Sequence, residues 1–112
     1  MLFLGPPSPP SAPRLIDITA VSITISWTAG FNGGLQQTFT VLYRAEGSDI
    51  EHEAKVNSDP DISRGDVVVY KLNNYAIVKS NTSYNIRIQA ENDFKEDAVV
   101  YGTSAKFTTL GK

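Results

Sequence analysis

The chain has 112 residues, ten basic and twelve acidic side chains, a formal net charge of -2 and no cysteine. This length fits one domain with a hydrophobic core of its own. The absence of cysteine excludes disulfides, thiolate metal sites and a cysteine nucleophile. Charge of both signs is well mixed, and no apolar run approaches the roughly 20 residues of a spanning helix. We therefore expect no nucleic-acid partner and no direct membrane insertion.

The first segment is proline-rich, because five of the six prolines lie between Pro6 and Pro13. Such a run favours extended polyproline II and cannot donate hydrogen bonds to a sheet. We predict a semi-rigid linker, or a cloning remnant, over residues 1–12 and a folded domain over 13–110. A ligand for an SH3- or WW-type domain is the alternative, with Arg14 as its one flanking basic anchor.

Alternation of apolar and polar residues predicts the first three strands, over 14–20, 21–28 and 37–45. The single tryptophan, Trp27, closes the second and is interpreted as a core anchor. The glycine-rich loop 29–35 lies between strands, so it lacks the helix start that a phosphate-binding loop needs. Phe31 in this loop either packs over the end of the sandwich or faces a partner.

The second half of the chain predicts further strands. Residues 51–56 fit a short edge strand, and 67–70 and 75–78 are rich in β-branched and aromatic residues. Strict alternation over 84–92 marks the central strand, with one face inward and the other in water. The last strand, 99–109, is interrupted at Gly102.

About seven short strands without a helical period predict an all-β, immunoglobulin-like antiparallel β-sandwich. The inward rows of these strands give the predicted core. Its members are Trp27, Phe39, Val41, Tyr43, Tyr84, Ile86, Ile88 and Ala90.

Several local patterns in this order resemble the fibronectin type III family. The proline-rich entry ends at Pro13, Trp27 closes the second strand, and Phe107-Thr108-Thr109 fits the last strand. Val78-Lys-Ser-Asn-Thr-Ser-Tyr84 is similar to the family's approach to a tyrosine corner, although Val78 and Ser80 replace the usual leucine and proline. The resemblance implies that the Tyr84 hydroxyl forms a hydrogen bond with a nearby backbone group.

A finer resemblance lies in Trp27-Thr-Ala-Gly-Phe-Asn-Gly-Gly-Leu-Gln-Gln-Thr-Phe39. It is similar to the membrane-proximal domain of nephrin-like immunoglobulin-superfamily cell-adhesion receptors. This resemblance implies a cell-surface ectodomain that is neighboured by other sandwich domains.

The sequence predicts no enzyme, no cofactor and no metal site. Glu51-His52-Glu53 contains the single histidine, and alternation on a strand points His52 away from its two neighbours. A solvated sheet edge is the interpretation, and weak metal binding is the alternative. A lone histidine beside an edge strand also does not support a serine-histidine-aspartate site.

Two short motifs are candidate sites. Asn81-Thr82-Ser83 is an N-glycosylation sequon, which predicts a glycan on Asn81 if the protein is secreted. Arg64-Gly65-Asp66 resembles the integrin-recognition tripeptide of some fibronectin type III domains, but it does not follow the sixth strand as it does there. The alternative for this tripeptide is a solvated turn.

These observations predict a non-enzymatic protein-interaction or spacer module of a multidomain extracellular or cell-surface adhesion protein. Its expected partners are neighbouring sandwich domains and a cell-surface receptor or integrin, and the isolated domain is expected to be monomeric. The alternatives are an intracellular structural or scaffold module of the same fold and an accessory domain of a larger enzyme or receptor.

Overall fold

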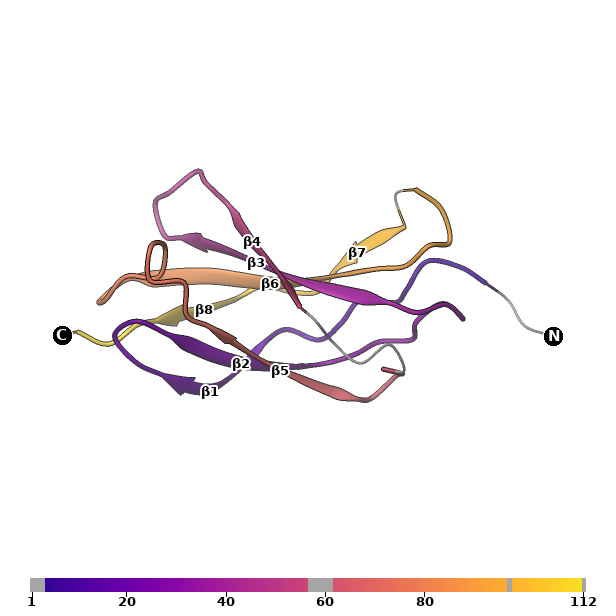
Figure 1. The fold of residues 1–112 in the computed structure, drawn as a ribbon, viewed down its shortest axis with the longest axis horizontal. Helices are drawn as coiled ribbons and strands as arrows, with labels where there is room; N and C mark the ends of the chain where they lie inside the picture. Colours follow the sequence, from indigo (N-terminus) through magenta and orange to yellow (C-terminus); the bar gives the residue numbers. More distant parts are fainter. Residues whose placement is uncertain (1–3, 57–61, 97, 112) are drawn as a thin grey trace.

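In a computed structural model, which describes residues 4–56, 62–96 and 98–111, the chain is a β-sandwich (Figure 1). One sheet has the order β1-β2-β5; the other has the order β4-β3-β6-β7, with β8 also paired to β6. All pairings are antiparallel, so the predicted fold class is confirmed. The strands are β1 Arg14–Ile18, β2 Ile23–Thr28, β3 Thr38–Ala45, β4 His52–Val56, β5 Val67–Leu72, β6 Ser83–Glu91, β7 Val99–Tyr101 and β8 Ala105–Thr108.

The core lies between the two sheets and follows the alternation of the strands. Along β6 every second residue is buried and the residues between are half-buried. Trp27 of β2 packs edge-to-face on Phe39 of β3, with ring centroids 5.7 Å apart and an interplanar angle of 68°. Each residue of the predicted core is buried, with at most 1% of its surface exposed.

The tyrosine corner takes the form that the resemblance implies. The Tyr84 hydroxyl donates to the Ile77 carbonyl at 3.0 Å and accepts from the Lys79 amide at 2.7 Å. Tyr84 itself is 1% exposed. One side chain therefore ties the start of β6 to the segment that precedes it.

One strand prediction differs from the structure, whereas the predicted interruption of the last strand at Gly102 is present. Residues 75–78 were expected to form a strand, which is wrong: Asn74 accepts backbone hydrogen bonds from Ile77 and Val78, and its side chain accepts from Ala76. These local bonds close a tight turn instead of a ladder. The last strand is divided into β7 and β8, so the described residues form eight strands. A side chain at Gly102 would meet the Pro10 carbonyl at this break.

The first strand contains an irregularity that changes its exposed face. The register of β1 against β2 shifts between Leu15 and Asp17, which leaves Ile16 as the extra residue. Ile16 is 59% exposed. A bulge of this kind twists an edge strand and makes it a poorer template for pairing with another chain.

The described part of the proline-rich segment lies along the sandwich, although residues 1–12 were expected to act as a linker; residues 1–3 lie outside the described residues. Its backbone amides at Gly5, Ser8 and Ser11 donate to the carbonyls of Gly33, Phe31 and Thr28 at 2.8 to 3.0 Å. Pro7 and Pro10 are buried. Prolines do not prevent this pairing, because the donors Gly5, Ser8 and Ser11 are not prolines and keep their backbone N–H groups.

The described part of the chain begins and ends at opposite ends of an elongated molecule (Figure 1). Its principal extents are 55 × 26 × 20 Å. In the part of the chain that the structure describes, no helix is long and apolar enough to cross a bilayer.

Candidate functional site

The outward face of the five-stranded sheet carries a group of charged side chains that is held by ion pairs. Residues at alternate positions of β3 and β6 point outward here, because Phe39, Val41 and Tyr43 and their β6 partners fill the core. Leu42 breaks this outward polar row, yet it is only 5% exposed. Its cross-strand neighbours are Glu53 and Arg87, whose long side chains can shield it.

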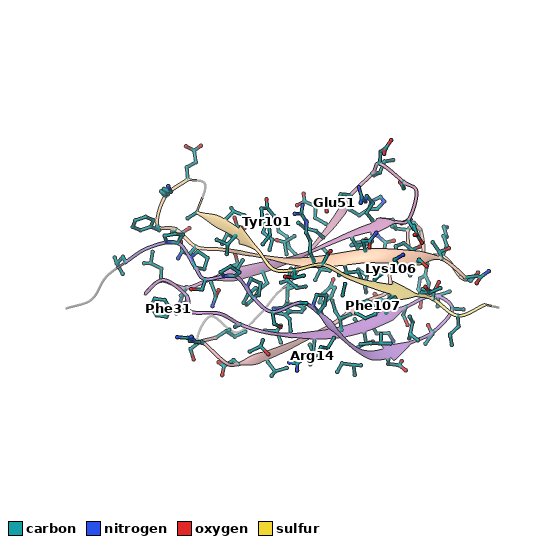
Figure 2. The ribbon with its side chains drawn as sticks, turned by 180° about the vertical axis from the view of Figure 1, so that it is seen from behind. Arg14, Phe31, Glu51, Tyr101, Lys106 and Phe107 are labelled. Carbon is teal, nitrogen blue, oxygen red and sulfur yellow. The ribbon has the colours of Figure 1, made fainter. Side chains whose placement is uncertain are left out.

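Arg87 of β6 is the centre of this face. Its guanidinium donates from Nε and Nη2 to the two carboxylate oxygens of Glu51 at 3.3 and 3.2 Å. The same guanidinium lies over the Tyr101 ring, 4.4 Å from its centroid. A two-pronged carboxylate contact and a cation–π contact together hold the side chain in one orientation. Figure 2 shows Glu51 and Tyr101 on one side of the molecule and Arg14 on the other.

A polar hollow of about 560 Å³ opens beside Arg87. It lies over β3 and β6, next to the turn that joins β3 to β4. Its lining consists of Arg44, Asp49, Glu51, Asn85, Arg87 and Ser104.

The hollow could receive a protruding polar group of another protein, because it is open and its lining is charged. Among the described residues no group of three or more histidine, cysteine, aspartate or glutamate side chains could hold a metal ion.

The two sequence motifs lie at opposite ends of the molecule. The amide of Asn81 donates to the carbonyl of Leu110, near the C-terminal end, while the carbonyl of Asp66 accepts from the amide of Ala29, beside the loop that contacts the N-terminal segment. The structure therefore does not combine them into one site.

The sequon lies on an exposed turn. Asn81 is exposed and has a φ of 50°, a left-handed conformation that asparagine tolerates. The Ser83 hydroxyl lies 2.6 Å from that of Thr108 in β8. The position leaves room for a glycan on Asn81 while the third residue of the sequon is held in the sheet.

The Arg-Gly-Asp tripeptide forms an exposed tight turn that leads into β5. The amide of Asp66 donates to the Ser63 carbonyl at 3.0 Å, and Gly65 has a φ of 91°. The Asp66 carboxylate oxygen Oδ2 accepts from the Ser63 amide at 2.9 Å. A receptor metal ion would therefore have to compete with this bond or use the other oxygen.

Phe31 is exposed and is not packed over the sandwich. It is 45% exposed, and Phe94 and Leu4 are exposed to a similar degree. The loops that carry them meet at Asn92, whose side-chain amide donates to the carbonyls of Gly5 and Asn32 and accepts from the Phe94 amide. Figure 2 shows Phe31 near one end of the molecule.

The sequence did not predict the arrangement around Arg87. Its partners come from separate strands, with Glu51 lying 36 positions away along the chain. The only available signal was the position of Arg87 in the outward row of the central strand.

Comparison with known proteins identifies the family. The family profile described as "Fibronectin type III domain" matches residues 8–103. The chain belongs to the fibronectin type III family. The resemblance found in the sequence is thereby confirmed.

This fibronectin type III domain is 26% identical to human nephrin over 114 aligned residues. The alignment covers 99% of the chain and 8% of nephrin, so the chain spans a small part of that protein.

Solved structures share the fold. The fibronectin type III domain of human fibronectin type III domain containing protein 3 has a TM-score of 0.67 at 16% identity, covering 96% of this chain and 90% of that one. The corresponding domain of human collagen XX has a TM-score of 0.64 at 21% identity, covering 96% of each chain. Titin domains A168–A170 give a TM-score of 0.69 at 21% identity, covering 93% of this chain and 32% of that one.

Proposed function

We propose that this fibronectin type III domain is a non-enzymatic interaction and spacer module of a multidomain cell-surface adhesion protein. The observation that carries the proposal is the similarity to human nephrin, which extends over 99% of the chain. The elongated shape and the placement of the two ends at opposite poles support a role in spacing neighbouring domains (Figure 1).

An extracellular location predicts a glycan on Asn81. The chain, expressed with a secretion signal in animal cells, is expected to carry additional mass that a peptide N-glycosidase removes. Asn81→Gln provides the matched control, because it keeps the amide but cannot be glycosylated. Intact-mass spectrometry measures the result, and an unshifted mass in secreted protein would contradict the glycosylation.

An interaction role predicts a specific partner at the cell surface. We would screen the folded domain against cell-surface ectodomains, including integrins, and expect saturable binding. Absence of any partner in this screen would leave the domain with a geometric role only, and a native cytosolic location of the full protein would favour the intracellular scaffold function.

The tripeptide Arg64-Gly65-Asp66 is tested in the same screen. If it engages an integrin, Asp66→Glu is expected to abolish binding, since it keeps the charge but displaces the carboxylate from a receptor metal ion. The variant Lys71→Glu, which alters another exposed charge on β5, should bind as well as the unmodified domain. Equal binding by both variants would exclude the tripeptide.

A further inference from the structure

The turn between β3 and β4 forms a projection beside the polar hollow. Figure 1 shows this turn rising away from the five-stranded sheet. It carries Ile50, which is 63% exposed, between Asp49 and Glu51 of the hollow's lining. An apolar protrusion and a recess are therefore adjacent on the same face.

The charges in the hollow leave one base and one acid without an ion pair. Glu51 is engaged by Arg87 at 3.2 Å, and Glu46 nearby is engaged by Lys106 at 3.0 Å. Arg44 and Asp49 form no ion pair with any residue that the structure describes. Both are exposed, so both are available to a partner.

This combination fits a surface that contacts its own copy. In a two-fold symmetric contact, a group on one copy meets its complement on the second, and the reverse contact occurs as well. A hollow that offers one unpaired base and one unpaired acid satisfies this requirement. A strongly acidic or strongly basic partner would instead match a face whose charges are mostly of the opposite sign, and this face carries both signs.

We propose that two copies of this domain associate through this face, with Arg44 of each copy paired with Asp49 of the other at the hollow, and with the projecting turn that carries Ile50 lying beside the hollow of the other copy. The proposal rests on the proposed function, because it names the partner of the interaction module. Arg87 and Tyr101 support the contact, since they are already held together and lose little conformational freedom on binding.

We expect the contact to be weak, because it is centred on one hollow whose lining is polar. Interfaces that bury less than about 1,200 Å² are mostly transient. The domain therefore remains monomeric in dilute solution and associates at high concentration or when many copies are displayed on one surface.

Sedimentation velocity from about 10 µM to about 1 mM measures this association directly, a range chosen for a weak contact. The variants Arg44→Asp and Asp49→Arg each place two like-charge pairs in the interface by symmetry. Each alone is expected to weaken self-association at least about tenfold. An equimolar mixture restores it, because residue 44 of one variant and residue 49 of the other are again oppositely charged.

Matched controls come from the other sheet. Lys71→Asp and Asp17→Arg make the same changes of charge on exposed residues of the three-stranded sheet, and these variants should associate like the unmodified domain. Equal thermal unfolding of all variants establishes that each is folded.

Several outcomes would overturn the proposal. These are a sample that stays monomeric at the highest concentration, single variants that associate normally, and a mixture that fails to recover. None of them affects the proposed cell-surface role, which the glycan on Asn81 and the binding screen test independently.

Discussion

Tyr84 shows how one hydroxyl can hold two segments together. Tyr84→Phe keeps the ring but removes the partner of the Lys79 amide and of the Ile77 carbonyl. The free energy of unfolding is expected to fall by about 1–3 kcal/mol, the range for leaving a buried polar group unsatisfied. Urea denaturation of the two proteins measures the difference.

Tyr75→Phe is the matched control for this prediction. Tyr75 is 69% exposed, so loss of its hydroxyl should change the stability by less than about 0.5 kcal/mol. Equal stability of Tyr84→Phe and the unmodified domain would show that the corner does not contribute to folding.

Tyr43 is expected to make the stability of the domain depend on pH in the alkaline range. Burial raises its pKa above the ordinary value of 10.0, the proximity of Tyr70 and Tyr84 raises that pKa further, and a hydrogen bond from Asn74 opposes the increase. The unfolded chain therefore releases this proton at a lower pH than the folded domain does. The stability contributed by the neutral side chain is complete below about pH 10 and is lost as the pH rises through the folded pKa.

Urea denaturation between about pH 8 and pH 11 tests this linkage. Tyr43→Phe is expected to lose less stability across this range than the unmodified domain, because its side chain cannot ionise. Tyr75→Phe should lose as much free energy of unfolding over this pH range as the unmodified domain does. If the free energy of unfolding falls equally with pH in all three proteins, Tyr43 is excluded as a source of the loss of stability at alkaline pH.

At the scale of elements, the N-terminal segment is predicted to be part of the folded domain. Deletion of residues 1–12 removes its hydrogen bonds to the β2–β3 loop and uncovers the faces against which Pro7 and Pro10 are buried. We expect a loss of about 2–4 kcal/mol in the free energy of unfolding, from a few buried hydrogen bonds and apolar contacts. A detached linker would leave the stability unchanged, so denaturation of the shortened chain decides between the two.

Two glycines isolate the contact with this segment. Gly33 and Gly47 have φ values of 76° and 84°, so alanine is strained at both positions. Only at Gly33 would the new methyl group also meet the Gly5 carbonyl and the Asn92 side chain, whereas Gly47 faces open space. Gly33→Ala is therefore expected to lower the melting temperature more than Gly47→Ala. Equal losses in a thermal scan would show that the N-terminal segment is not held against Gly33.

The predictability of these elements depends on the kind of contact that defines them. The alternation of Tyr84, Ile86, Ile88 and Ala90 records burial on one face, so the central strand could be predicted from its residues alone. The turn at 75–78 is formed by local hydrogen bonds to Asn74, and these bonds outweigh the strand propensity of the residues.

Other contacts left no comparable pattern. The proline-rich segment packs with its backbone carbonyls against glycines. Such contacts leave no periodic pattern of hydrophobic residues in the sequence. The Arg87 cluster depends on strand register over long separations, and one sequence does not specify that register.

At the scale of the whole molecule, we expect the domain to be an extended monomer in dilute solution. Small-angle scattering should give a maximum dimension close to the long extent of 55 Å and a radius of gyration near 14.6 Å. The hollow lies on the flank of the long axis, so association through it would increase the radius of gyration with little increase in length. A doubled length at high concentration would instead indicate contact between the ends.

The docked N-terminal segment also has a mechanical consequence. A pull on the two ends runs along the long axis, nearly parallel to the strands (Figure 1). The bonds of Gly5, Ser8 and Ser11 to the β2–β3 segment lie across that direction and would be loaded together in shear, not opened one after another. In a cell-surface protein under tension, this segment would transmit force directly to β2 and make the junction stiff.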